Sequence, residues 1–329
     1  MRKVTIEDIS RHTGLSRGTV SRALNDRPDI SEQTKQRVLE ACNQLRYVPS
    51  HAARSLATGR RYAVATVVDD LRSTYAGSFL RGAINRARRD RYAVFVTELG
   101  SEPDAALDHV RTLVSERVDC VLLATPLAEH FAREITENLG DRPLVAATPM
   151  AQADVLTPDY AEAGRLAARH VLDRAGHDIL YVHEAGSPGA DLRRAGFEEV
   201  CRGAGVDAGR LVIELPERGA AGDRYGAVRS RIGQVRGLAA STDFLALDLM
   251  LVACESGRMP GRQMAIMGQG NELAGALVSP ALTTIDFAGE EIGRRAMDLA
   301  LQRVGKVRQD APQQVLVPPM LIERESTRS

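Results

Sequence analysis

The chain has 329 residues, of which 44% are hydrophobic and 26% are charged, a composition typical of a folded globular protein with two or three domains. It has no apolar run of the roughly 18–20 residues that cross a bilayer, and we expect no secretory signal because the basic start lacks an apolar segment. The four cysteines are widely spaced without a CxxC pair, which argues against a disulfide scaffold or zinc ribbon and favours the cytoplasm.

The net charge of zero conceals an uneven distribution along the chain. Residues 1–61 hold 12 Arg and Lys against 6 Asp and Glu, whereas the rest of the chain holds 31 against 37. A small basic segment on a larger acidic body indicates that the first segment meets a polyanion. Chance scatter of charge is the alternative.

The beginning of the chain predicts three short helices. A T-x-x-D box at Thr5 opens the first helix, and Gly14 ends it. Ser16 caps a second helix of about eight residues, in which Val20 and Leu24 belong to the buried stripe.

A third helix completes the small domain. Ser31 caps it, and Val38 and Cys42 close the core. Two short helices joined by a glycine-containing turn form a helix-turn-helix, whose second helix enters the DNA major groove. A generic three-helix domain is the alternative, but Arg17 and Arg22 on the outward side of the second helix favour DNA, because guanidinium groups suit guanine edges and phosphates.

A further short helix is predicted from about Ser50, after Pro49, to about Ala57, with Gly59 as its stop. A helix of this length is unstable alone in water, so we expect it to form only when something binds it. Leu56 is apolar and has no core to join in such a segment. A plain interdomain linker is the alternative.

From Tyr62 onward, apolar runs alternate with helical stretches. The alternation predicts parallel sheets with right-handed crossovers, and about 270 residues are too many for one such sheet, so we expect two α/β lobes. Ligands of open α/β sheets bind at the carboxyl ends of strands, which here means the cleft between the lobes. The predicted strands are 63–69, 92–99, 120–125, 143–148, 178–184, 210–215, 237–241 and 263–268, with extended segments at 282–287 and 313–323.

The segments TIEDISRHTGLSRGTVSRALN and YVPSHAARSLATG resemble the DNA-binding head and hinge of the lac-repressor (LacI/GalR) family of bacterial transcription regulators, without a gap through residues 5–58. A looser resemblance continues through the body. It implies an α/β protein with an all-α head and a two-lobed, periplasmic-binding-protein-like core built on parallel sheets. The implied domains are 1–48 for the helix-turn-helix, 49–61 for the hinge helix and linker, and 62–329 for the core, with one lobe at about 62–157 and 288–313 and the other at about 158–287 and 314–329.

The resemblance also implies which residues contact DNA. Leu56 would wedge into the minor groove at the centre of a palindromic site beside the leucine of a two-fold mate, and contacts on the kinked duplex would offset the unstacking. Gly18 departs from the family, which usually has a base-reading side chain at this position. We therefore expect Arg17 and Arg22 to carry more of the recognition of the operator sequence. The expected DNA-binding residues are Thr5, Ser16, Arg17, Gly18, Thr19, Ser21, Arg22, Asn25, Ser31, Ser50, Ala53, Arg54 and Leu56.

In the body, the resemblance implies a small carbohydrate-like effector between the lobes. The family usually has two adjacent acids after the last strand of the second lobe, whereas this chain has Gly268-Gln269-Gly270-Asn271. Because that acid is missing, we expect Arg193 to bind a carboxylate or phosphate, which favours a sugar acid over a neutral sugar. The candidate effector-binding residues are Ser73, Tyr75, Asp159, Arg193, Asp243 and Gln269, and for each the alternative is a solvated loop residue or a helix cap.

These inferences predict a DNA-binding transcription regulator, acting as a repressor, in the cytoplasm. It would bind a palindromic operator as a homodimer, because two half-sites require two heads. Its effector would be a sugar or sugar acid. We expect no catalytic residue, metal site, cofactor or membrane association.

An α/β enzyme and an architectural DNA-binding protein are the alternatives. Gly268-Gln269-Gly270 resembles the start of a dinucleotide-binding loop, but Leu273 stands where the third glycine belongs, and the segment lies late in the chain. The sequence has no P-loop, HExxH or GxSxG motif. A large two-lobed body argues against an architectural protein, because bending DNA needs no ligand cleft.

Overall fold

The computed structural model describes residues 4–24, 27–47, 55, 58–100, 103–115, 118–125, 129–150, 153–184, 189–207, 210–216 and 223–328. The chain divides into two compact units, Met1–Tyr62 and Ala63–Ser329. Within the described ranges, no helix is long and apolar enough to cross a membrane.

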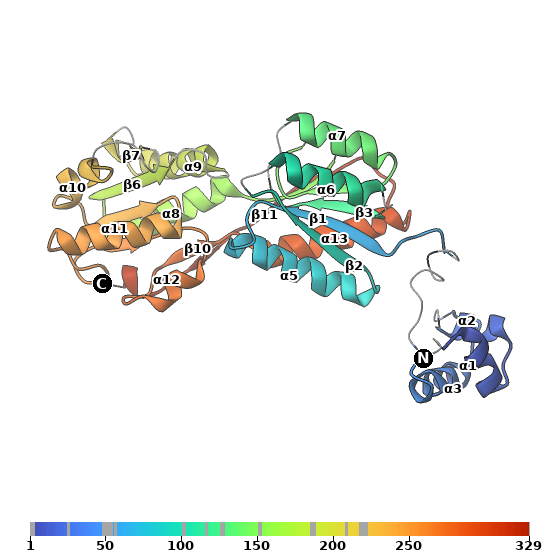
Figure 1. Cartoon of the computed structure of the whole chain (residues 1–329). Coiled ribbons are helices and arrows are strands. Elements are labelled where there is room, and N and C mark those ends of the chain that lie inside the picture. Colours follow the sequence, from blue (N-terminus) through green and yellow to red (C-terminus); the bar gives the residue numbers. More distant parts are fainter. Residues whose placement is uncertain are drawn as a thin grey trace. The chain divides into compact units, whose positions relative to one another are not determined.

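In its described residues, the first unit contains the bundled helices α1 (Ile6–Thr13), α2 (Arg17–Leu24) and α3 (Glu32–Gln44), as predicted (Figure 1). Gly14 follows α1 in the left-handed conformation, with φ 70°. The Ser16 hydroxyl accepts a hydrogen bond from the Thr19 N–H at 3.1 Å, which caps α2. The core consists of Ile9, Val20, Ala23, Val38, Ala41 and Cys42.

The second unit contains two parallel sheets, and the first has six strands in the order β11-β5-β4-β3-β1-β2. Helices α5 (Thr74–Arg89) and α13 (Gly289–Val304) cover one face, and α6 (Pro103–Ser115) and α7 (Glu129–Leu139) cover the other (Figure 1). The strands are β1 (Ala63–Val68), β2 (Ala93–Glu98), β3 (Cys120–Leu123), β4 (Leu144–Ala146), β5 (Asp154–Pro158) and β11 (Gln314–Val317).

The second sheet has four parallel strands in the order β7-β6-β8-β9. Its two apolar clusters place α8 (Tyr160–Ala175) and α9 (Ala190–Gly203) on one face and α10 (Gly226–Ile232) and α11 (Asp243–Glu255) on the other. The remaining elements are β6 (Ile179–Glu184), β7 (Val212–Leu215), β8 (Gly237–Ala240), β9 (Ala265–Met267), α12 (Leu273–Leu277), β10 (Thr284–Asp286), β12 (Met320–Ile322) and the 3₁₀ turn η2 (Glu325–Thr327).

The predicted alternation and parallel sheets are confirmed, with four differences. Strand β5 was not predicted, because its five residues are few and end in Pro158. The extended segment 313–323 is two strands separated by Pro318-Pro319, which lack N–H donors. Its first half pairs with β5, so the return to the second lobe falls after Val317 and not at residue 314. Segment 282–287 supplies β10, which pairs antiparallel with β12.

Helices α5 and α13 run parallel in close contact, from Tyr75 beside Gly289 to Arg86 beside Asp298. The approach depends on glycine, because a Cβ on Gly82 would lie 1.9 Å from the Glu290 carbonyl oxygen. The parallel arrangement brings the N-termini of both helices to the side of the lobe that meets the second sheet.

Candidate functional site

The first candidate site is the outward face of α2. Val20 and Ala23 anchor the helix in the core, and Arg17, Gly18 and Arg22 are exposed. Ser16 is also exposed, and Thr19 and Ser21 are half-buried. The helix therefore presents its two arginines to solvent, on the face predicted to meet DNA.

Carboxylates lie beside both arginines. Glu7 Oε2 is 3.2 Å from Arg17 Nε, and Asp29 Oδ2 is 3.7 Å from Arg22 Nε. These two acids were not among the predicted site residues, because they come from α1 and from the segment after α2.

Thr5 and Ser31 have local structural roles at helix starts. The N–H and hydroxyl of Thr5 donate to Asp8 Oδ2 at 2.9 Å and 2.8 Å, and Ser31 accepts from the Thr34 N–H at 3.3 Å. Both residues stay predictions for contact with DNA. The predicted DNA-binding residues Asn25, Ser50, Ala53, Arg54 and Leu56 lie outside the described residues.

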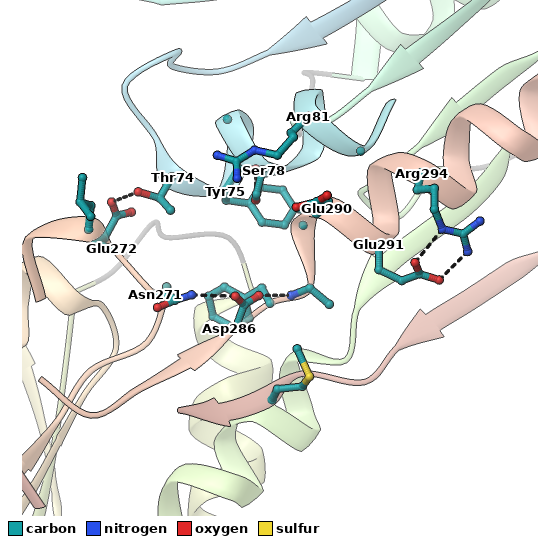
Figure 2. A pocket seen from close by; sticks show the side chains of 18 of the residues that line it. Thr74, Tyr75, Ser78, Arg81, Asn271, Glu272, Asp286, Glu290, Glu291 and Arg294 are labelled. Atoms are coloured by element: carbon teal, nitrogen blue, oxygen red, sulfur yellow. Dashed lines mark hydrogen bonds and ion pairs between the residues drawn. The ribbon is translucent and has the colours of Figure 1, made fainter. Parts of the chain in front are cut away.

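The second candidate site is a pocket of about 920 Å³ between the two lobes (Figure 2). Thr74 and Tyr75 of α5 line it from the first lobe, and Asn271 and Glu272 line it from the second. In Figure 2, Thr74 and Glu272 point toward each other, and the Thr74 hydroxyl donates a hydrogen bond to the Glu272 carboxylate. The pocket is therefore bounded by a direct polar contact between the lobes.

Charged and amide groups line the floor of this pocket. Asn271 Nδ2 donates to Asp286 Oδ2 at 2.8 Å, and Arg324 donates to Asn271 Oδ1 at 2.7 Å. Asp286 also accepts from the Ala288 N–H at 2.6 Å, just before α13. This network holds the crossover from β10 to α13, so the pocket floor is also a connection between the lobes.

Arg193 of α9 is buried, with 3% of its surface exposed. Its guanidinium carbon lies 5.7 Å from the centroid of the Tyr160 ring and 5.4 Å from that of Phe287. Burial lowers the pKa of Arg193, and the nearby Tyr181 and Tyr160 hydroxyls oppose this shift. Phe287 also lines the interlobe pocket, so the guanidinium packs against a ring of the pocket lining.

Two more predicted effector residues carry buried polar atoms. The Tyr75 hydroxyl and Gln269 Oε1 have no hydrogen-bond partner among the described residues. Burial raises the pKa of Tyr75 well above its ordinary value. Buried polar atoms are normally paired, so these two are candidates for a ligand or a bound water.

The other three predicted effector residues have structural roles. Ser73 caps α5 through the Ala76 N–H at 3.4 Å, and Asp159 caps α8 through the Glu162 N–H at 2.8 Å. Asp243 is fully buried, and burial raises its pKa to about 6. Its two oxygens accept from the Thr284 hydroxyl at 2.6 Å and from the Glu272 N–H at 2.7 Å.

Ser73 and Asp159 are helix caps, and Asp243 is a buried acid, and all three stay predictions for effector binding. Tyr75, Arg193 and Gln269 stay predictions for effector binding.

Thr74, Asn271, Glu272 and Asp286 line the pocket and were not predicted. Asn271 and Glu272 directly follow the Gly268–Gly270 segment after β9, so the rule that ligands bind at the carboxyl ends of strands could have found them. Thr74 lies between the predicted residues Ser73 and Tyr75 after β1, so the same rule could have found it, but nothing in the sequence pairs it with Glu272, 198 residues away.

Three family descriptions match successive parts of the chain. Residues 5–50 match "Bacterial regulatory proteins, lacI family". Residues 62–218 match "Periplasmic binding proteins and sugar binding domain of LacI family", and residues 168–327 match "Periplasmic binding protein-like domain".

Similar whole proteins are transcription regulators. The HTH-type transcriptional repressor PurR of Mannheimia succiniciproducens is 27% identical over 334 residues, with 98% of each chain covered. The HTH-type transcriptional regulator DegA of Bacillus subtilis is 25% identical over 332 residues, covering 99% of this chain and 98% of its own.

Solved structures share the fold. The lac repressor dimer bound to operator and the anti-inducer ONPF superposes with a TM-score of 0.75 at 22% identity, over 100% of both chains. The complex of the transcriptional regulator CelR with cellobiose gives 0.69 at 21% identity, over 98% of this chain and 100% of that one.

Proposed function

Because the chain belongs to the lacI family of bacterial regulatory proteins, we propose that it represses transcription as a homodimer on a palindromic operator, under the control of a small anionic sugar bound between its lobes. It is a DNA-binding transcription regulator and not an enzyme.

The observation that carries DNA binding is the orientation of α2. Its buried side fits the head core through Val20 and Ala23, and its exposed side holds Arg17 and Arg22. A helix presented in this way can enter the major groove, where arginine donates two hydrogen bonds to a guanine edge. A short recognition helix contacts few base pairs, so two heads on two half-sites are needed for a specific operator.

The second unit offers an apolar surface for the second copy. Helices α11 and α12 contact each other, and each leaves large side chains in solvent. Leu273 and Leu277, one turn apart on α12, are 68% and 77% exposed, and Phe244 and Leu251 on α11 are also exposed. Large apolar side chains exposed on neighbouring helices mark a protein interface, and the two-fold operator makes a second copy of this chain the occupant we propose.

The proposed effector site is the aromatic and polar group around Arg193. The rings of Tyr160 and Phe287 offer flat apolar faces, and the Tyr75 hydroxyl and Gln269 Oε1 are buried polar atoms available to a sugar hydroxyl or its water. Arg193 is buried beside these two rings, and its guanidinium is a group that pairs with a carboxylate or phosphate. These features support an anionic sugar.

We propose that effector binding moves the lobes and thereby the two hinge segments of the dimer. A ligand shifts such an equilibrium only by its differential affinity for the two states, commonly about 1–3 kcal/mol. An effect of this size changes operator affinity about 5- to 150-fold, which a retardation assay resolves easily.

The test is a thermal-shift screen of the full-length protein with aldonates, sugar phosphates and the matching neutral sugars, followed by calorimetry and operator retardation. Arg193→Met should abolish binding of the best anionic ligand. Arg194→Met is the matched control, because this neighbouring side chain is 41% exposed and pairs with Glu198 at 2.7 Å. Parental affinity in Arg193→Met would remove Arg193 from the site, and a neutral sugar as best ligand would refute the anionic effector while leaving the regulator intact.

A further inference from the structure

Both arginines of the proposed DNA-reading face are contacted by carboxylates through the same atom, Nε. Glu7 lies beside Arg17, and Asp29 lies beside Arg22, with the four side chains between 47% and 73% exposed. An acid on a surface that meets phosphates weakens DNA binding by repulsion. A carboxylate beside a base-reading arginine therefore indicates a role other than strengthening the binding of DNA.

Glu7 has little to contribute to the stability of the head. An exposed ion pair contributes about 0–1 kcal/mol. The start of α1 is already capped by the neighbouring Asp8, which accepts from Thr5 and pairs with Arg11 at 3.3 Å. Within the described part of the head, Glu7 pairs with Arg17 of the next helix, across the turn of the helix-turn-helix.

The geometry of this pair bears on how Arg17 can meet DNA. The distance of 3.2 Å in this pair is measured to Nε, and the two terminal nitrogens are the donors that can reach O6 and N7 of guanine. The guanidinium is planar and rigid, so holding one edge restricts the direction of the others. An arginine without this restraint turns more readily to a phosphate, a contact that carries no sequence information.

We propose that Glu7 is a positioning residue for base recognition: its carboxylate holds Arg17 toward the base edges and away from phosphates, and so increases the preference for the operator over other DNA. The proposal rests on the proposed DNA-binding function. Asp29 stands in the same relation to Arg22, at the longer distance of 3.7 Å.

The experiment uses the full-length protein and an operator duplex selected by it from random duplexes. The base pair contacted by Arg17 is identified as the position at which Arg17→Ala no longer prefers one base over the others. A second duplex differs from the operator only at that base pair. Glu7→Gln should reduce the preference between the two duplexes about three- to fivefold, which corresponds to at most about 1 kcal/mol, the contribution of an exposed ion pair. On the changed duplex, the slope of log K against log salt should become steeper by about 0.9, the value for one added phosphate contact.

Three controls separate positioning from charge and from folding. Glu32→Gln removes the same charge from the head, where Glu32 pairs with Lys35 at 2.7 Å, and should keep the base preference. Glu7→Asp keeps the charge with a shorter reach and should lose the preference. In an Arg17→Ala background, Glu7→Gln should change the preference no further.

Parental preference in Glu7→Gln and Glu7→Asp would overturn the proposal, as would an equal loss in the Arg17→Ala background. If Glu7→Gln lowers the thermal midpoint of unfolding, the proposal is judged on Glu7→Asp, from the ratio of its affinities for the two duplexes. A parent protein that selects no duplex from the random pool would contradict the proposed DNA-binding function itself.

Discussion

The Thr74 hydroxyl, in the first turn of α5, donates a hydrogen bond to the carboxylate of Glu272, which precedes α12 in the other lobe. The N–H of Glu272 in turn donates to Asp243 at the start of α11. A side chain of the first lobe is thereby linked to a fully buried acid of the second. This connection stabilises the present arrangement of the lobes.

Thr74→Val removes the donor of this bond and keeps the shape of the side chain. A hydrogen bond to a charged group contributes about 1.5–3 kcal/mol, so we expect a lower free energy of unfolding and a larger radius of gyration of the core by X-ray scattering. The control is Thr112→Val, whose exposed hydroxyl donates only to the Asp108 carbonyl of its own helix. Identical scattering of parent and Thr74→Val would show that the bond does not hold the lobes.

Gly82→Ala should destabilise the second unit severely. The added Cβ would meet the Glu290 carbonyl oxygen at 1.9 Å, which forces α5 and α13 apart. Overpacking of this kind costs about 1–3 kcal/mol or more, measurable by urea unfolding. Gly77→Ala is the control on the same helix, since a Cβ there meets nothing within 4 Å, and it should be neutral or stabilising by up to about 1 kcal/mol.

We expect Asp243 to lower the free energy of unfolding as the pH rises. Burial raises its pKa from the ordinary 3.8 to about 6, so between these values the folded protein binds this proton more tightly than the unfolded chain. Its contribution is therefore favourable below about pH 4 and is lost as the pH rises through 6, by at most about 1.4 kcal/mol per pH unit. Asp243→Asn has no such group, so the difference in free energy of unfolding between parent and variant should change with pH across this window. If the difference in free energy of unfolding between parent and Asp243→Asn does not change with pH, the pKa of Asp243 is not raised in the folded protein.

Leu56→Ala should weaken operator binding without destabilising the second unit. The resemblance assigns Leu56 to the minor-groove wedge, and removing the wedge loses the contacts that a kinked duplex permits. We expect at least a tenfold loss of operator affinity, or about 1.4 kcal/mol, in a retardation assay. Equal operator affinity of variant and parent, with equal thermal midpoints, would rule out the wedge.

Much of the head could be predicted because its signals are local. The Thr5 box, the Gly14 stop and the Ser16 cap each involve residues within a few positions of one another, and the structure has all three at the expected helix ends. The strands of the body were equally visible as apolar runs. Strand β5 was not predicted, because five residues that end in proline cannot be distinguished from a loop by sequence pattern.

The sequence by itself determined the order of the elements, the family resemblance and the outward arginines of α2, since these follow from neighbours along the chain. The tertiary structure alone decided which polar residues meet. It turned Asp243 inward to Thr284, 41 residues away, and brought Glu272 to Thr74, 198 residues away. Such pairs depend on how two sheets and their helices pack, and burial then decides whether a polar side chain is free for a ligand or bonded within the protein.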